Sequence, residues 1–288
     1  MTGRLLRLLE LGARGLRRLG LGRLVDRAGA SVGGLAARVP VRIDGLRLTG
    51  RHVGQLFYLR ELARGRDRFL AELLRAAVPP GGVAVDAGAH IGYLTLVLAE
   101  AAGPDGRVLA IEPDPAAAAT LRANVRRNGF EGRVVVIEAA VGAAPGEATL
   151  HVSGGGETSS LAPVPGARNA VSIAVRPIDD LVEEDPVDLV KLDLEGSEVE
   201  ALHGMRRLLR RQPDLILVVE LNPSLLLEMN TSAAELLALL EAEGFSIWQI
   251  DEEAGRLSPR VDLGRSEYVN LLCTRGRAQP PAAEAPRV

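Results

Sequence analysis

The stretch VAVDAGAHIG (residues 83–92) decides the fold class of this 288-residue chain. Its apolar first half is typical of a buried strand, and Asp86 lies where that strand is expected to end. Gly88 and Gly92 then frame a turn that leads into the helical pattern of residues 93–102. Glycine suits a backbone that turns tightly or comes close to a ligand. The stretch therefore predicts a strand, a glycine turn and a helix, which is the unit that doubly wound sheets repeat.

Further strand patterns follow along the chain, and most are separated by helical patterns. The strand patterns lie at residues 106–115, 132–142, 187–196, 213–223, 245–251 and 267–274. The helical patterns lie at residues 66–78, 115–129, 197–212 and 232–244. Such alternation builds a parallel sheet with helices on both faces. The sequence therefore predicts an α/β fold with a doubly wound, mostly parallel sheet of seven strands.

Residues 146–182 interrupt this alternation. They read as two strands joined by a Gly/Ser-rich loop, with no helix between them. We interpret them as a β insertion over the ligand-binding edge of the sheet. Ser159 and Ser160, in the loop, are predicted to line the pocket for the substrate.

The two ends of the chain are predicted to lie outside the main domain, which we place at residues 66–274. Residues 1–65 form a basic N-terminal extension, with arginine-rich amphipathic helices within residues 3–27 and a small hairpin at 41–50. The tail, residues 275–288, is rich in proline and alanine and is expected to be disordered.

Bulk composition limits the location and the partners. The chain has a net charge of −3, and no stretch approaches the length of a membrane span or of a signal-peptide core, so we expect a cytoplasmic protein. Basic amphipathic helices can lie on an anionic membrane surface, or pack on the body or on another subunit. Contact of the N-terminal helices with a membrane and a homo-oligomer are therefore both left open.

An acid at the end of the second strand indicates the kind of cofactor. Glu112 comes 26 residues after Asp86, and an acid at that place can accept hydrogen bonds from two ribose hydroxyls. His90 occupies the position where a dinucleotide-binding turn needs its second glycine, which argues against an NAD-dependent oxidoreductase. The pattern fits S-adenosylmethionine better, because its sulfonium and amino groups are cationic.

Three blocks carry a resemblance to a known family. VDAGAHIG, AIEPDP and VDLVKLDLEGSEVEALHGM resemble the corresponding blocks of the FkbM-type methyltransferases, which belong to the class I S-adenosylmethionine-dependent enzymes. The resemblance covers roughly residues 66–274 and implies a Rossmann-like sheet. His90 departs from the asparagine that such families often have. The expected cofactor-binding residues are Asp86, Gly88, His90, Gly92, Glu112, Pro113, Glu138 and Ala139.

The lone lysine of the chain, Lys191, lies in VKLDLEGSE (190–198) beside two acids. On a strand, Lys191, Asp193 and Glu195 would share one face. Asp193 is the first candidate to orient or deprotonate a hydroxyl acceptor, or to bind the amino group of the cofactor, and Glu195 is the second candidate base. Lys191 would keep both carboxylates ionised, since a nearby cation favours the charged form.

Polar residues also end the fifth strand of the predicted sheet. Glu220 and Asn222 are predicted to contact the substrate. An all-oxygen divalent metal site formed with Asp193 is a less favoured alternative, as is capping of the segment that follows. The sequence therefore predicts no metal.

The favoured function is O-methylation of a hydroxyl group on a small metabolite, such as one of secondary metabolism, or on a sugar. This acceptor class follows from the resemblance. Nucleic acid is not expected, because DLEG lacks the prolines and the aromatic residue with which amino-methyltransferases stack a flipped base, and only 3% of the chain is aromatic. A non-catalytic S-adenosylmethionine-binding or scaffold protein is the alternative.

Overall fold

The computed structural model describes residues 40–152, 159–161, 169–183, 185–264, 266–276 and 278–280. The helices predicted within residues 3–27, and residues 281–288 of the predicted tail, lie outside the described residues.

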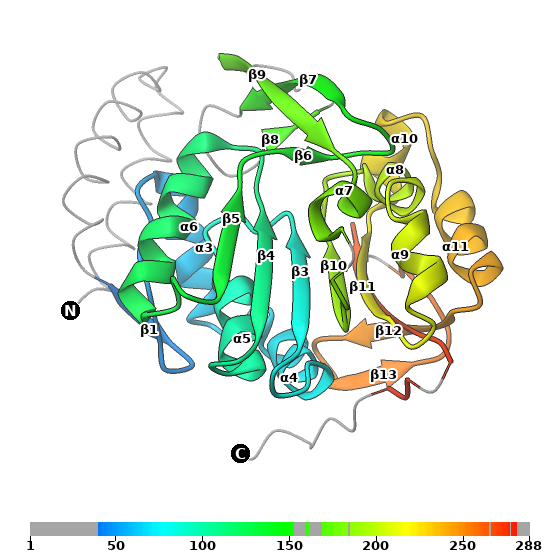
Figure 1. Ribbon diagram of the computed structural model, residues 1–288, viewed down its shortest axis with the longest axis horizontal. Coiled ribbons are helices and arrows are strands. Elements are labelled where there is room, and N and C mark those ends of the chain that lie inside the picture. Colours follow the sequence, from blue (N-terminus) through cyan, green and yellow to red (C-terminus); the bar gives the residue numbers. More distant parts are fainter. Residues whose placement is uncertain are drawn as a thin grey trace.

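An eight-stranded sheet forms the centre of the described part of the chain (Figure 1). Its order is β5-β4-β3-β10-β11-β14-β12-β13, with parallel pairing from β5 to β11 and antiparallel pairing from there to β13. The strands are β3 (Val83–Ala87), β4 (Arg107–Ile111), β5 (Val134–Ile137), β10 (Leu189–Leu192), β11 (Ile216–Leu221), β12 (Ser246–Asp251), β13 (Arg256–Ser258) and β14 (Val269–Thr274). The predicted α/β fold with a mostly parallel sheet is confirmed. The sheet has one strand more than the predicted seven, because the short and polar β13 has no strand pattern.

Helices cover both faces of this sheet because its side chains alternate between two cores. In β4, Val108 and Ala110 face the core of one side, and Leu109 and Ile111 that of the other. The first core includes residues of α3 (Val53–Leu62), α4 (Arg68–Ala77), α5 (Tyr93–Ala102) and α6 (Pro115–Asn128). The second includes residues of α7 (Ile178–Val182), α8 (Glu198–His203), α9 (Arg206–Arg211), α10 (Pro223–Glu228) and α11 (Ala233–Ala242). The sheet is therefore doubly wound.

The chain reverses its direction across the sheet between β3 and β10. From β3 it proceeds outward to β4 and β5, and it then returns to β10, which lies directly beside β3. The register pairs Lys191 with Asp86, so both side chains emerge on the same face of neighbouring strands. Ligands of doubly wound sheets bind at such a switch point, outside the carboxyl ends of the strands.

The strands of the predicted insertion form a second, four-stranded sheet of order β6-β9-β7-β8 together with β6, which belongs to the strand predicted at 132–142 (Figure 1). Its strands are β6 (Ala140–Val141), β7 (Gly146–Val152), β8 (Ser159–Ser160) and β9 (Asn169–Arg176). The second predicted strand was too long: it ends at Arg176, and Pro177, which has no backbone N–H, is the N-cap of α7. Leu150 of β7 is buried. Leu150 and Leu161, which follows β8, both line a pocket at the edge of the central sheet.

The single helix predicted over residues 197–212 is wrong, because the chain forms α8 and α9 with a break at Gly204. A Cβ atom on Gly204 would overlap the carbonyl oxygen of Gly142, so only glycine fits where this break passes the segment that precedes the insertion. The carboxylate of Asp179 then accepts hydrogen bonds from the backbone N–H groups of Arg207 and Leu208, both at 2.8 Å, and caps α9.

The described part of the N-terminal extension packs on the sheet-and-helix body. The predicted hairpin is present as β1 (Val41–Ile43) and β2 (Leu46–Leu48), and its apolar residues share the first core. The side-chain amide of Asn124 on α6 donates to the carbonyl of Thr49 at 3.1 Å, and its oxygen accepts from the Thr49 N–H at 2.9 Å. The division at residue 66 stays a prediction.

Candidate active site

A pocket of about 360 Å³ opens at the carboxyl ends of the central strands. Most of the predicted site residues line it, namely Asp86, Gly88, His90, Glu112, Pro113, Ala139, Lys191, Asp193, Glu195 and Glu220. They come from segments more than one hundred residues apart, which the parallel sheet brings together at one edge.

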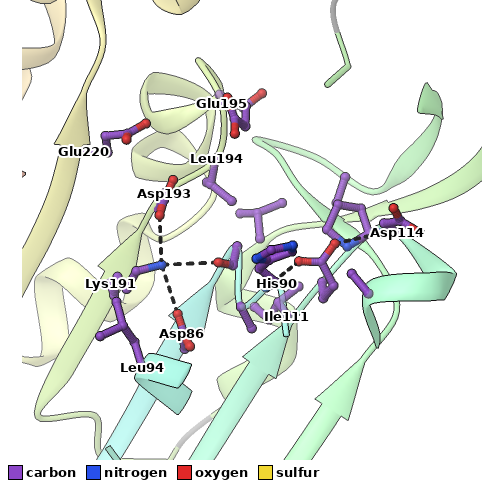
Figure 2. A pocket seen from close by; sticks show the side chains of 18 of the residues that line it. Asp86, His90, Leu94, Ile111, Asp114, Lys191, Asp193, Leu194, Glu195 and Glu220 are labelled. Carbon is purple, nitrogen blue, oxygen red and sulfur yellow. Dashed lines mark hydrogen bonds and ion pairs between the residues drawn. The ribbon is translucent and has the colours of Figure 1, made fainter. Parts of the chain in front are cut away.

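Lys191 is the centre of what we call the paired cluster (Asp86, Thr95, Lys191 and Asp193). Figure 2 shows its ammonium between the two aspartates, 3.1 Å from Asp86 Oδ1 and 3.3 Å from Asp193 Oδ2. It also donates to the carbonyl of Gly88 at 3.2 Å, and Thr95 Oγ1 donates to Asp86 Oδ2 at 2.6 Å. Burial lowers the pKa of Lys191, but the two aspartates outweigh this and raise it above its ordinary value. Lys191 is therefore a permanent cation, hydrogen-bonded to the carbonyl of Gly88 and ion-paired with both aspartates.

The glycine turn brings the backbone close to the paired cluster. Gly88 has φ +82°, and a Cβ atom there would overlap the carbonyl oxygen of Asp193. His90 has φ +48°, a strained value for a side chain larger than glycine, and its backbone N–H donates to Glu112 at 2.7 Å. Gly92 is the N-cap of α5 and does not line the pocket; a Cβ atom there would overlap the side chain of Leu121.

Glu112 is buried directly after β4, and each of its carboxylate oxygens accepts a hydrogen bond from a different backbone segment. Oε2 accepts from the N–H of His90, and Oε1 accepts from the N–H of Asp114 at 2.8 Å. Burial raises the pKa of Glu112 to about 7, although these two hydrogen bonds act in the other direction. Glu138, predicted beside it, is exposed, forms an ion pair with Arg122 and does not line the pocket.

Three more acids form what we call the acidic cluster (Glu195, Glu198 and Glu220). Burial raises the pKa of Glu195 to about 7, and the charges of Asp193 and Glu198 add to this. Burial also raises the pKa of Glu220 well above its ordinary value, helped by Asp193, Glu195 and Glu198. Glu198, with a pKa raised by burial to about 7, accepts from the N–H of Leu194 at 2.8 Å. These carboxyl groups therefore hold protons near neutral pH, unlike ordinary surface acids.

The prediction that Glu195 continues the face of the strand is wrong. β10 ends at Leu192, and Glu195 lies in a turn with φ +52°, followed by Gly196 with φ +101°. A Cβ atom on Gly196 would overlap the carbonyl oxygen of Leu225, so only glycine fits where this turn passes α10. The turn, and not strand alternation, aims Glu195 at the pocket.

The remaining predicted substrate residues are placed differently. Asn222 does not line the pocket: its side-chain oxygen accepts from the N–H of Leu225 at 3.3 Å and caps α10. Ser159 and Ser160 pair with Val152 and His151 of β7, and their side chains lie outside the described features. Their contact with substrate stays a prediction, as does that of Glu220.

The described residues include neither a clustered metal-ligand set nor a membrane-spanning helix. No group of three or more His, Cys, Asp or Glu side chains there is arranged to hold a metal ion. None of the described helices has the length and apolar character needed to cross a membrane. The cytoplasmic location, the membrane-surface contact and the homo-oligomer stay predictions.

Part of the pocket wall was not predicted from the sequence. Tyr58, Arg66, Asp67 and Tyr268 also line it, and they come from the N-terminal extension, the start of the main domain and the segment before β14. Two of the three tyrosines of the chain are in this set. Because only 3% of the residues are aromatic, each tyrosine could have been singled out from the sequence as a candidate pocket residue.

The pocket residues fit an adenosine cofactor with a cationic centre. Each carboxylate oxygen of Glu112 has used one lone pair on a backbone N–H, which leaves a second for a ribose hydroxyl. The acids around Asp193 suit a sulfonium and an ammonium group. The switch point, the glycine turn and the acid after the second strand together define the class of S-adenosylmethionine-dependent methyltransferases.

The comparison with known families agrees. A model of the FkbM methyltransferase domain matches residues 86–247, and the chain therefore belongs to the FkbM methyltransferase family. This match includes every predicted catalytic and cofactor-binding residue.

Individual proteins that resemble this chain have low sequence identity to it. The chain is 28% identical over 197 residues to Methyltransferase 1 of Beauveria bassiana (strain ARSEF 2860), which covers 60% of this chain and 75% of that protein. It is 32% identical over 78 residues to Transmembrane O-methyltransferase of Propithecus coquereli, which covers 27% of this chain and only 28% of that protein. The crystal structure of an O-methyltransferase from Bacillus cereus in complex with SAH has 15% identity and a TM-score of 0.45, over 87% of this chain and 100% of that one. A TM-score this low carries no function across.

Proposed function

We propose that this methyltransferase transfers a methyl group to a hydroxyl group of a small metabolite or a sugar. The observation that carries the proposal is Glu195, a carboxyl group whose pKa is raised by burial to about 7 in the pocket that also contains Glu112 and Asp193. A hydroxyl acceptor must lose its proton during transfer, whereas the cofactor supplies only the activated methyl group. A base with a pKa near the working pH performs such proton transfer best.

Glu195 is the better of the two candidate bases. Asp193 is held by Lys191 at 3.3 Å, so its carboxylate is engaged. Within the described residues, no hydrogen bond or ion pair holds the carboxylate of Glu195, which leaves it able to accept a proton. Asp193, fixed by Lys191 beside the glycine turn, is suited to orient the hydroxyl or the amino group of the cofactor.

Positioning is the other contribution of the chain. Methyl transfer is an in-line displacement, so the hydroxyl oxygen, the methyl carbon and the sulfur must be aligned. Lys191 contacts Asp193 and also the carbonyl of Gly88, and these contacts hold Asp193 in place relative to the glycine turn. Leu150 and Leu161 of the insertion add apolar wall to the same pocket.

The experiment is a transfer assay with S-adenosylmethionine that carries a carbon-13 methyl group, and a panel of sugars, glycosides and hydroxylated metabolites. Each acceptor is paired with its amino analogue, and NMR identifies the atom that receives the label. We expect new O-methyl signals. Label found on nitrogen or carbon, with none on oxygen, would contradict the proposal.

On the acceptor so identified, Glu195→Gln is expected to lower kcat by about 10²–10⁴-fold, the contribution of a general base, without changing the affinity for S-adenosylhomocysteine. In the unsubstituted enzyme, kcat should rise as the pH increases to about 7 and then level off, because only the carboxylate form of Glu195 accepts a proton. Glu200→Gln is the matched control, since Glu200 is an exposed acid on α8 outside the pocket. If Glu195→Gln retains full kcat, Glu195 is not the base.

A further inference from the structure

Arg66 is held in the pocket wall by residues from three segments. Its Nη2 donates to the hydroxyl of Tyr268 at 3.0 Å, and its guanidinium lies over the ring of Tyr58, 5.6 Å from the centroid. Its Nε is 3.7 Å from Oδ1 of Asp67, and Tyr58 donates to the other oxygen of Asp67 at 3.0 Å. These contacts orient the guanidinium, while 44% of the side chain stays exposed.

The same contacts connect Arg66 to the glycine turn. The ring of Tyr58 lies 5.1 Å from the ring of His90, centroid to centroid, and the backbone of His90 donates to Glu112. One aromatic ring thus separates Arg66 from the turn that approaches the cofactor. Arg66, Tyr58 and His90 all line the one pocket.

The charge of the pocket makes Arg66 distinctive. Among the described residues that line it, Lys191 and Arg66 carry the basic side chains, and His90 is neutral because burial lowers its pKa to about 4. Lys191 is already engaged by ion pairs with Asp86 and Asp193 and by its hydrogen bond to the carbonyl of Gly88. Arg66 uses one N–H on Tyr268 and turns Nε toward Asp67, so three of its five N–H groups remain for a ligand.

We infer that Arg66 binds the carboxylate of the amino-acid portion of the cofactor. This inference rests on the proposed function. S-adenosylmethionine has a single carboxylate, and the planar guanidinium fork matches a carboxylate with two parallel hydrogen bonds.

The test compares two ligands that differ by the carboxylate alone. Calorimetry measures the affinity of the full chain for S-adenosylhomocysteine and for its decarboxylated analogue, S-adenosyl-3-thiopropylamine. The unsubstituted protein should prefer S-adenosylhomocysteine by about tenfold or more, the value of a charge-assisted hydrogen bond. In Arg66→Gln this preference should disappear through weaker binding of S-adenosylhomocysteine, and Arg66→Lys should restore part of it.

Controls separate the possible failures. Arg64→Gln should leave both affinities unchanged, because Arg64 pairs with Glu61 at 2.9 Å on the surface and does not line the pocket. If Arg66→Gln keeps the preference, or weakens both ligands equally, Arg66 does not bind the carboxylate and the inference is wrong. If the unsubstituted protein binds neither ligand, the proposed function fails first, which is a different result.

Discussion

The paired cluster and the acidic cluster lie in one pocket but handle charge in opposite ways. In the paired cluster, buried Asp86 meets Lys191 and Thr95, so every charge has a partner. In the acidic cluster, Glu195 and Glu220 face like charges, which raise their pKa values together with burial. The ion pairs of the paired cluster hold neighbouring strands in place, whereas the carboxyl groups of the acidic cluster exchange protons near neutral pH. The difference indicates which side is structural and which side performs chemistry.

The largest effect is expected from removing the cation of the paired cluster. Lys191→Met leaves the buried carboxylate of Asp86 without its counter-ion, and breaking a buried pair in this way typically costs about 3–5 kcal/mol. Urea unfolding measures the change in the free energy of unfolding.

The matched control for this change neutralises both partners. The double variant Lys191→Met, Asp86→Asn should recover much of the loss, because no buried charge is left unpaired. If the single and the double variant are equally destabilised, Lys191 contributes packing and not charge, and the comparison between the clusters breaks down.

A smaller effect is expected at Glu112, which uses its carboxylate on backbone N–H groups and belongs to neither cluster. Glu112→Gln replaces one acceptor oxygen with an N–H donor that faces the backbone of the turn. We expect the affinity for S-adenosylhomocysteine to fall about tenfold to a hundredfold, the range of a hydrogen bond to a charged group. Glu138→Gln should not change it, because Glu138 lies outside the pocket. Equal losses in the two variants would show that the pocket boundary is wrong.

The smallest effect concerns pH and the acidic cluster. The folded pKa of Glu195, about 7, lies above its ordinary value of 4.5, and that of Glu220 is raised further. The folded protein therefore binds protons that the unfolded chain releases, so stability present below pH 4.5 is lost as the pH rises to 7 and beyond. Glu220→Gln cannot ionise and should melt about 2–4 °C higher than the unsubstituted protein at pH 8, with no difference at pH 4. If the difference in Tm between the two proteins is the same at pH 4 and at pH 8, the raised pKa of Glu220 is contradicted.

Local sequence patterns correctly predicted the elements that are bounded by proline, by glycine or by an Asp-Gly turn. Pro115 and Gly129 bound α6 as expected, and the Asp44-Gly45 pair forms the predicted hairpin turn with positive φ at both residues. The pattern failed at Gly204 and at the turn of Glu195 and Gly196, where the backbone lies close to segments distant in the sequence. A close approach of this kind leaves no periodic signal along the chain.

The sequence by itself determined the doubly wound fold, because buried strands, helices and glycine turns each have a local signature. It also determined that Asp86, Glu112 and Asp193 meet at one edge of the sheet, because parallel strands end together. Only the tertiary structure decided which charges are paired. Lys191 lies in register with Asp86, Glu195 reaches the pocket through a strained turn, and Arg66 enters it from the segment before α4. Pairing depends on distances between segments that are far apart in the chain, and those distances exist only after folding.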